Sequence, residues 1–412
     1  MTSTLTRPRN SLLRPSDPVE RALTWSTVAA SLAKGVLFGV SALFFTTVVG
    51  VSAATVGVGL TIAGGVGVGA AFAAGYLSDR VGAPRVLLAA TLGQGLALVA
   101  YLFADTAIAF GIIACVALGA QSMQRTAQMT LLAQHFTGPD RVEVRARLRV
   151  ATNVFIGLGS ASAAGALTVG TRSAYLIAML SSAVLVLASA VPQRALAGLR
   201  RPAAGEPQRP CAVPGRSPLR DRTYLAVTAL NAIMSIQFGM LTIGVPLWVT
   251  GHTRAPAATV AVVLTLNTLI VALFQVRAAR RARDVTTAGR AVAHAGVLLV
   301  LACLLYALAA SAAAAIAVSL LLLAALAHSI GEILSEAGGW GLAFELADPH
   351  NAGAYQGVSQ TGFAAGTMLA PVMVTTTAID HGGPGWLVLA ALFLAAGVGT
   401  LLIARSHRPP RA

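Results

Sequence analysis

The chain has 412 residues, of which 56% are hydrophobic and only 10% are charged, and its mean hydropathy is +0.76. This composition excludes an ordinary soluble domain, because the surface of such a domain has to be largely polar. The formal net charge of +15 comes from arginines scattered over short polar stretches without interleaved aromatic side chains, which argues against nucleic-acid binding. The sequence therefore predicts an integral membrane protein.

Residues 1–23 precede the first apolar segment. They combine three prolines with charges of both signs, and they lack the short apolar core and small-residue cleavage site of a signal peptide. We expect this stretch to be a disordered cytoplasmic tail.

Twelve apolar segments follow, each long enough to cross roughly 30 Å of hydrocarbon, which takes about 20 helical residues. They cover residues 24–49, 55–77, 86–104, 107–133, 150–170, 173–191, 223–250, 257–276, 290–310, 313–344, 355–378 and 385–404. The predicted fold is all-α, with twelve transmembrane helices.

The longest interruption, residues 192–222, divides the twelve segments into two sets of six. Its prolines and seven arginines are typical of a flexible linker rather than a folded domain. We therefore expect six-helix bundles over residues 24–191 and 223–404, followed by a short cytoplasmic tail at 405–412.

Positive charge is unevenly distributed over the connections between segments. If the N-terminus is cytoplasmic, the outside-facing connections hold only Arg172 and Arg254, and the remaining loop arginines face inside. Because cytoplasmic loops retain Lys and Arg, both termini are expected in the cytoplasm of a plasma-membrane protein. The same charge predicts attraction to anionic lipid headgroups.

A charged turn separates the second and third segments. The second helix is expected to leave the bilayer at Gly75, and Gly82 permits a tight reversal of the chain before Arg85. An anion is favourable beside a helix N-terminus, so Asp79, followed by Arg80, is expected to latch a neighbouring helix on the cytoplasmic side.

Residues 75–85, Gly-Tyr-Leu-Ser-Asp-Arg-Val-Gly-Ala-Pro-Arg, resemble the G-x-L-x-D-R-x-G signature of the major facilitator superfamily of secondary transporters. Residues 340–357 look like the connection between the tenth and eleventh helices in actinobacterial drug-exporter-like members. Gly362, Gly366 and Pro371 resemble the Gly-rich antiporter motif, whereas the fifth segment has the glycines without the proline. The resemblance implies two pseudo-symmetric six-helix bundles that work by alternating access around a midplane cavity.

Ionisable side chains inside apolar segments usually mark ion pathways. On the tenth segment His328, Glu332 and Glu336 recur at intervals of four, which places them on one slowly drifting stripe of a helix. Arg125, followed by Gln128, resembles the R-x-x-Q element of proton-linked superfamily members. We expect His328, Glu332 and Glu336 to couple protons to transport. Arg125 is expected either to take part in this coupling or to bind a negatively charged group of the substrate.

A second set of polar residues is expected to line a substrate cavity. Lys34, the only lysine of the chain, lies inside the first segment, where it either contacts substrate or pairs with Glu332 or Glu336. Single amides on membrane helices either line cavities or hold helices together. The candidates are Lys34, Gln94, Gln121, Asn231, Gln237 and Asn267.

The resemblance implies proton-driven export of a small organic compound such as a drug, an antibiotic or another natural product. Proton-coupled or facilitative uptake of a nutrient is the alternative. A transport-dead receptor or a membrane-embedded enzyme is less favoured, because no folded output domain, metal-ligand pair, nucleophilic triad or phosphate loop is apparent. We expect a monomer whose partners are the substrate, protons and lipid, without cofactor or metal.

Overall fold

A computed structural model of the chain describes residue 15 and residues 17–43, 52–104, 106–169, 171–197 and 216–407. Every regular element within these ranges is helical. Residues 1–14 and 16 of the predicted N-terminal tail, 198–215 of the predicted linker and 408–412 of the predicted C-terminal tail lie outside the described residues. The expectation of a disordered tail over residues 1–23 is wrong from Pro18 on, because the first helix begins there. Residues 192–197 of the predicted linker are helical as well.

The first part of the chain forms α1 (Pro18–Leu43), α2 (Ala53–Val81), α3 (Ala83–Ala100), the 3-10 turn η2 (Tyr101–Phe103), α4 (Ala107–His135), α5 (Asp140–Val169) and α6 (Arg172–Ala197). The second part forms η3 (Pro218–Arg220), α7 (Arg222–Met234), α8 (Gln237–Gly239), η4 (Met240–Gly244), α9 (Val245–His252), α10 (Ala258–Ala279), α11 (Val285–Ala309), α12 (Ala314–Glu345), η5 (Pro349–Asn351), α13 (Ala352–Val374), η6 (Thr375–Ile379) and α14 (Gly383–Ser406). Polar N-caps start several of these helices; the side chain of Ser52, for example, accepts a hydrogen bond from the Thr55 amide.

Ten helical stretches among the described residues are long and apolar enough to cross a membrane. They correspond to ten of the twelve predicted segments. The other two segments fall in the helices α1 and α5. α5 begins at Asp140, about ten residues before its predicted start, so the arginines that follow Asp140 are helical rather than part of a loop.

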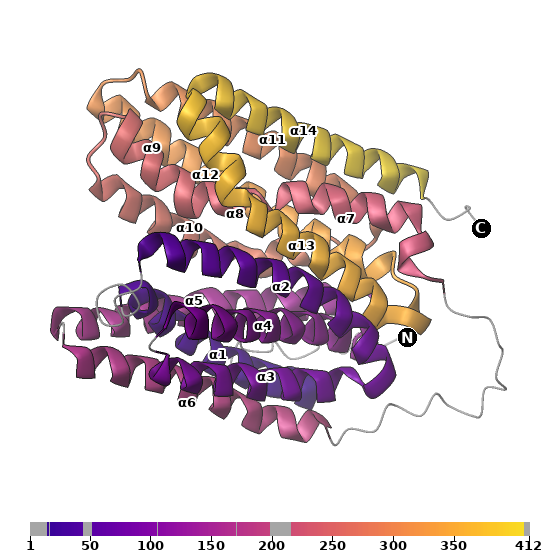
Figure 1. Cartoon of the computed structure of the whole chain (residues 1–412). Coiled ribbons are helices and arrows are strands. Elements are labelled where there is room, and N and C mark those ends of the chain that lie inside the picture. Colours follow the sequence, from indigo (N-terminus) through magenta and orange to yellow (C-terminus); the bar gives the residue numbers. More distant parts are fainter. Residues whose placement is uncertain are drawn as a thin grey trace.

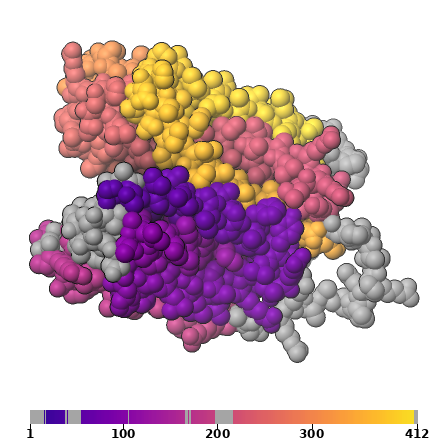
Figure 2. Space-filling view, in the orientation of Figure 1, coloured from indigo at the N-terminus to yellow at the C-terminus, as the bar shows by residue number. Residues whose placement is uncertain are grey.

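The helices form two groups that meet along a seam (Figures 1 and 2). We call α1 to α6 the N-terminal group and α7 to α14 the C-terminal group. In the N-terminal group α1 packs on α5 and α6, and α4 packs on α2 and α3; in the C-terminal group α11 packs between α12 and α14. The seam is formed mainly where α2 and α4 contact α13 and where α5 contacts α10 and α12.

The contact between α2 and α13 is a backbone contact. A side chain at Gly75 would place its Cβ 2.6 Å from the Cα atom of Gly357, which is closer than atoms can pack. Glycine on both helices therefore lets the two backbones approach directly, as small residues do in membrane helix pairs.

The seventh predicted segment is a broken helix rather than a continuous one. It comprises α7, the short α8, a π-helical turn at η4 and α9. Pro246, at the start of α9, has no amide hydrogen and its ring crowds the carbonyl of Thr242, so regular α-helical hydrogen bonding cannot continue through η4. The break places irregular backbone beside the seam.

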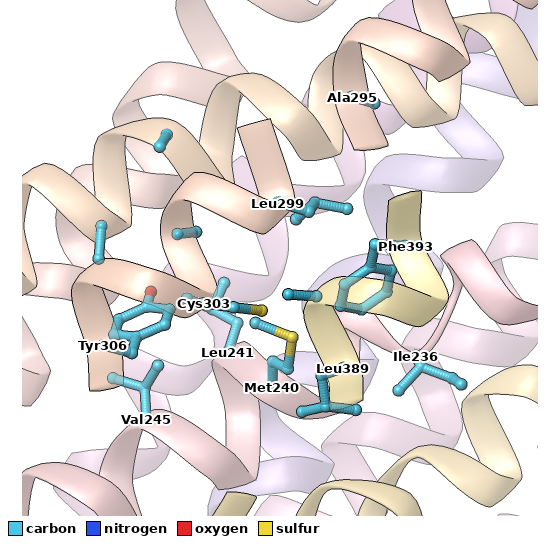
Figure 3. Close-up of a cluster of buried hydrophobic side chains, with 14 of the residues drawn as sticks. Ile236, Met240, Leu241, Val245, Ala295, Leu299, Cys303, Tyr306, Leu389 and Phe393 are labelled. Atoms are coloured by element: carbon cyan, nitrogen blue, oxygen red, sulfur yellow. The ribbon is translucent and has the colours of Figure 1, made fainter. Parts of the chain in front are cut away.

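The core of the C-terminal group supports this broken helix. Figure 3 shows Met240 and Leu241 of η4 packed beside Cys303 of α11 and Leu389 of α14, all of them buried. The indole Nε1 of Trp248 donates a 2.8 Å hydrogen bond to the carbonyl of Tyr306, which fixes α9 against α11. The irregular turn is thus held by dense packing.

Candidate functional site

A cavity of about 490 Å³ lies between the two groups of helices. Its volume is in the range of small-molecule sites in proteins. The N-terminal group contributes α1, α3, α4, α5 and α6 to its wall, and the C-terminal group contributes the broken helix, α12 and α13. The polar side chains in its wall include Lys34, Gln94, Gln121, Gln124, Arg125, Gln128, Arg145, Arg149, Gln193, Glu336 and Gln360.

An ion-pair cluster joins α5 to α12 at this cavity. The guanidinium of Arg149 lies 3.1 Å from Glu332 and 3.7 Å from Glu336. The amide of Asn267 on α10 donates a 2.9 Å hydrogen bond to the other oxygen of Glu332. Glu332 is 2% exposed and Glu336 9% exposed, so both carboxylates are withdrawn from bulk solvent while Arg149 compensates their charge.

Arg149 differs from the partners that the sequence indicates for these acids, Lys34 and Arg125. The reason is the early start of α5: by apolarity alone Arg149 falls in a connection, whereas the helix carries it into the seam. Arg145 lies one turn earlier on the same face of α5 and also lines the cavity. The four-residue spacing of these two arginines is the signal in the sequence that could have found them.

Three arginines line the cavity, and each of them lies against an aromatic ring of the C-terminal group. Arg125 is 5.2 Å from the ring centre of Phe363, Arg145 is 5.1 Å from Trp340 and Arg149 is 5.3 Å from Phe238. The electron-rich face of an aromatic ring attracts a cation such as a guanidinium. Every one of these contacts crosses the seam.

Amide side chains form another part of the wall, within the N-terminal group. Gln124 of α4 donates a 2.7 Å hydrogen bond to Gln94 of α3, and Gln193 of α6 donates a 2.6 Å bond to Ser26 of α1. Gln128 reaches Thr27 over 3.3 Å. These bonds fix the four helices around the cavity and leave Gln121 among its lining residues.

Besides Glu332, four of the residues predicted for proton coupling or substrate binding lie away from the cavity wall. His328 is fully buried and packs against Tyr306, and Gln237 is also buried. Asn231 packs against the backbone of Gly339, where an added Cβ would be 2.6 Å from its side-chain oxygen. Asn267 is bonded to Glu332 and to Ser329. The structure thus groups Lys34, Gln94, Gln121, Arg125 and Glu336 in the wall, with Glu332 directly behind it.

The Asp79 turn lies at one end of the seam. Its carboxylate accepts hydrogen bonds of 2.8 Å from the amide of Gly353 and 2.7 Å from the amide of Ala354. These amides belong to the first turn of α13, so the helix N-terminus that the sequence predicts beside Asp79 is that of α13. Gly82 has a φ of +97°, the reversal expected there, and Arg80 and Arg85 are exposed.

A second contact across the seam lies at this same end. Arg280, just after α10, donates a 2.8 Å hydrogen bond to Glu143 of α5. Burial alone would raise the pKa of the Glu143 carboxyl, but the hydrogen bonds and positive charges of Arg280 and Arg147 lower it below its usual value. Glu143 is therefore ionised at neutral pH. Hydrogen bonds at Asp79, Glu143 and Arg149 thus join the two groups.

A polar cavity between two groups of apolar helices is the architecture of a membrane transporter. The sequence profile of the Major Facilitator Superfamily matches residues 23–371, and the chain belongs to that superfamily. Among curated protein sequences, none matches this chain.

Solved structures with the same fold are transporters of distant sequence. The human organic anion transporter MFSD10 (TETRAN) superposes with a TM-score of 0.67 at 16% identity, covering 93% of this chain and 99% of its own. A bacterial homologue of the iron transporter ferroportin, outward-facing with soaked iron, gives 0.70 at 14% identity, with 96% and 100% covered. The transporter FucP in the outward conformation gives 0.71 at 12% identity, with 95% and 99% covered. Family and fold indicate a multi-pass membrane transporter rather than an enzyme.

Proposed function

We propose that this protein is a secondary active transporter that couples proton movement to transport of a small organic compound by alternating access. The observation that carries the proposal is the Arg149–Glu332–Glu336 cluster, which spans the seam beside a polar cavity. Intramembrane acids of this kind usually mark proton pathways. Following the resemblance, we propose export of the compound, with proton-coupled or facilitative uptake as the alternative direction.

The two acids are suited to different roles. Glu332 is held by both Arg149 and Asn267, whereas Glu336 lies 3.7 Å from Arg149 and lines the cavity. A proton that arrives from the cavity meets Glu336 first. The protonated carboxyl of Glu336 is neutral, so it attracts Arg149 less and the attraction between α5 and α12 weakens. We assign proton exchange to Glu336 and positioning of Arg149 to Glu332, while Arg125 tunes the charge of Glu336 from the facing wall.

Alternating access requires the contacts of the Asp79 end to break. In the described conformation Asp79 holds α13, and Arg280 holds Glu143, so this end of the seam is closed. The distribution of arginines favours a cytoplasmic position for this end, which makes the conformation closed to the cytoplasm. Asp79, with Gly75 and Gly82 setting its geometry, would act as the conformational latch.

The membrane topology is part of the proposal. α1 has 26 residues and α5 has 30, enough to cross a bilayer alongside the ten apolar stretches, which gives twelve membrane helices in two sets of six. Both termini and the linker would be cytoplasmic, and the protein would work as a monomer in the plasma membrane.

Reconstituted protein provides the test. Proteoliposomes with an imposed pH gradient and an internal pH-sensitive dye should show proton flux only when a transported compound is added. Glu336→Gln should abolish gradient-driven transport and keep exchange of substrate across the membrane, because an amide mimics the protonated acid and cannot release a proton. Glu345→Gln is the matched control, since Glu345 is an exposed acid at the end of the same helix. Gradient-driven transport by the Glu336 variant at the wild-type rate would refute the assignment.

A further inference from the structure

The charges around the cavity do not balance. Four basic side chains line it, and the two acids of the site, Glu332 and Glu336, both lie within 4 Å of the same arginine, Arg149. Among the residues that the structure describes, no carboxylate lies within 4 Å of Arg125 or Arg145. An excess of positive charge in a pocket between helices favours binding of an anion.

The hydrogen-bonding state of Arg125 and Arg145 points to the same ligand. No hydrogen bond joins either guanidinium to another described residue, and Nε of Arg145 is buried without an acceptor. Their neighbours Phe363 and Trp340 attract the charge and offer no lone pair to the N–H groups. A guanidinium has five N–H donors, arranged so that two of them match the two oxygens of a carboxylate. The N–H groups of Arg125 and Arg145 are therefore suited to bind an oxyanion.

Apolar surface lies beside these donors. Phe238, Phe363 and Pro371 of the C-terminal group face the cavity, and Gln121 and Gln360 add amide groups that can orient a polar ligand. The volume of about 490 Å³ accommodates a compound of drug size rather than an inorganic ion alone.

We propose that the cavity binds a small organic acid, with its carboxylate or a similar oxyanion group at Arg125 and Arg145 and its apolar part against Phe238 and Phe363. The claim that an organic acid is the transported compound rests on the proposed function. The claim that the cavity binds an organic acid rests on the cavity alone.

Proton and anion then bind together. Glu336 is faced by Arg125, Arg145 and Arg149 from the N-terminal group and by Glu332 on its own helix, with Lys34 farther along the same wall. Protonation of Glu336 removes a negative charge beside the oxyanion, so each ligand raises the affinity for the other. Anion binding should take up a proton and strengthen as the pH falls. Such coupling is expected for movement of both ligands in one direction, so for an organic acid it favours proton-coupled uptake, the alternative direction of the proposed function, over export.

Three naphthalene compounds test the charge requirement on the full-length protein in detergent: 1-naphthoate, its neutral amide and 1-naphthylmethylamine. We expect titration calorimetry to show naphthoate binding at least about tenfold more tightly than the amide, a ratio worth about 1.4 kcal/mol, with no detectable binding of the amine. In weak buffer, binding of naphthoate should withdraw protons from solution. Equal affinity for acid and amide, or no binding of the acid at millimolar concentration, would overturn the proposal.

Variants locate the site. Arg125→Gln should weaken naphthoate binding about tenfold or more and leave the amide unaffected, and Arg125→Lys should restore part of the affinity. Arg172→Gln, at an exposed arginine that begins α6 and lies outside the cavity wall, should bind like the wild type. An equal loss of acid and amide binding in Arg125→Gln would contradict an oxyanion contact. If that variant does not fold, the comparison of the three compounds on the wild-type protein decides alone.

The same compounds separate the two proposals. Binding of naphthoate without any gradient-driven transport in proteoliposomes would remove the proposed function and keep the anion site. Gradient-driven transport of the amide or amine, with no binding of naphthoate, would remove the anion site and keep the proposed function.

Discussion

The two walls of the cavity have different chemistry. The N-terminal group supplies the cations, Lys34, Arg125, Arg145 and Arg149, whereas the C-terminal group supplies the acids and the aromatic rings. The ion pairs and the cation–aromatic contacts of the site therefore join the two groups. Under the proposed alternating access, a change in charge at the cavity acts directly on the relative positions of the two groups, without a relay through either core.

The largest effect should follow removal of Arg149. Arg149→Gln leaves Glu332 and Glu336 as buried like charges without their cation, a defect of about 3–5 kcal/mol. We expect loss of folded protein on size-exclusion chromatography. The double variant Arg149→Gln/Glu332→Gln should recover folded protein without transport. Normal yield and turnover in the single variant would show that the cluster does not join the walls.

Gly75 tests the closed end of the seam. Gly75→Leu would force α2 away from α13 at their backbone contact, and overpacking of this kind costs about 1–3 kcal/mol or more. Transport in proteoliposomes should fall at least about tenfold. Gly69→Leu is the control, because nothing lies within 4 Å of a Cβ at Gly69 on the same helix. A similar loss in both variants would trace the effect to α2 rather than to the contact.

Asp79→Asn should have a smaller effect. The amide keeps one acceptor for the α13 amides and loses the charge that the helix N-terminus favours, a change of about 0.3–2 kcal/mol. The protein should insert normally and transport several-fold more slowly. Unchanged turnover would mean that the turn sets topology alone.

The smallest effect should come from Arg280→Gln. Arg280 is 55% exposed, and an exposed pair contributes about 0–1 kcal/mol. We expect turnover within about twofold of the wild type at neutral pH. The lowered pKa of Glu143 makes the contribution of this pair complete above the usual value of 4.5, and it is lost only as the pH falls through the lower pKa of the folded state. If the wild type opened at the Asp79 end between pH 6 and 8, and Arg280→Gln removed this pH dependence, the prediction for the Arg280–Glu143 pair would be wrong.

The membrane helices follow from simple physics, because a bilayer demands long apolar helices and the sequence displays them. The turn at Asp79 is also predictable, since acid, glycine and helix boundary lie together in the chain. Glu332 and Glu336 of α12 are easy to find in the sequence, because burying a carboxylate in an apolar segment costs free energy and such residues are rare there. These features depend on local sequence.

The rest of the site depends on packing that apolarity does not reveal. Arg145 and Arg149 are assigned to a loop when only apolar runs define helices, although α5 starts at Asp140. His328 shares the spacing of Glu332 and Glu336, but each step of four residues rotates a helix by about 40°, which turns His328 toward Tyr306 of α11. The break before Pro246 likewise depends on the packing of η4 against α11 and α14.

The glycine contact between α2 and α13 has a consequence for how the transporter can diversify. Because Gly75 meets Gly353 and Gly357 through backbone atoms, this point of contact between α2 and α13 needs no interlocking side chains at Gly75. The side chains that line the cavity come from other turns of α13 and from neighbouring helices, and none comes from α2. Under the proposed alternating access, substitutions in the cavity wall leave this glycine contact unchanged. Ligand specificity can therefore change, by evolution or in the laboratory, separately from the movement of the helices.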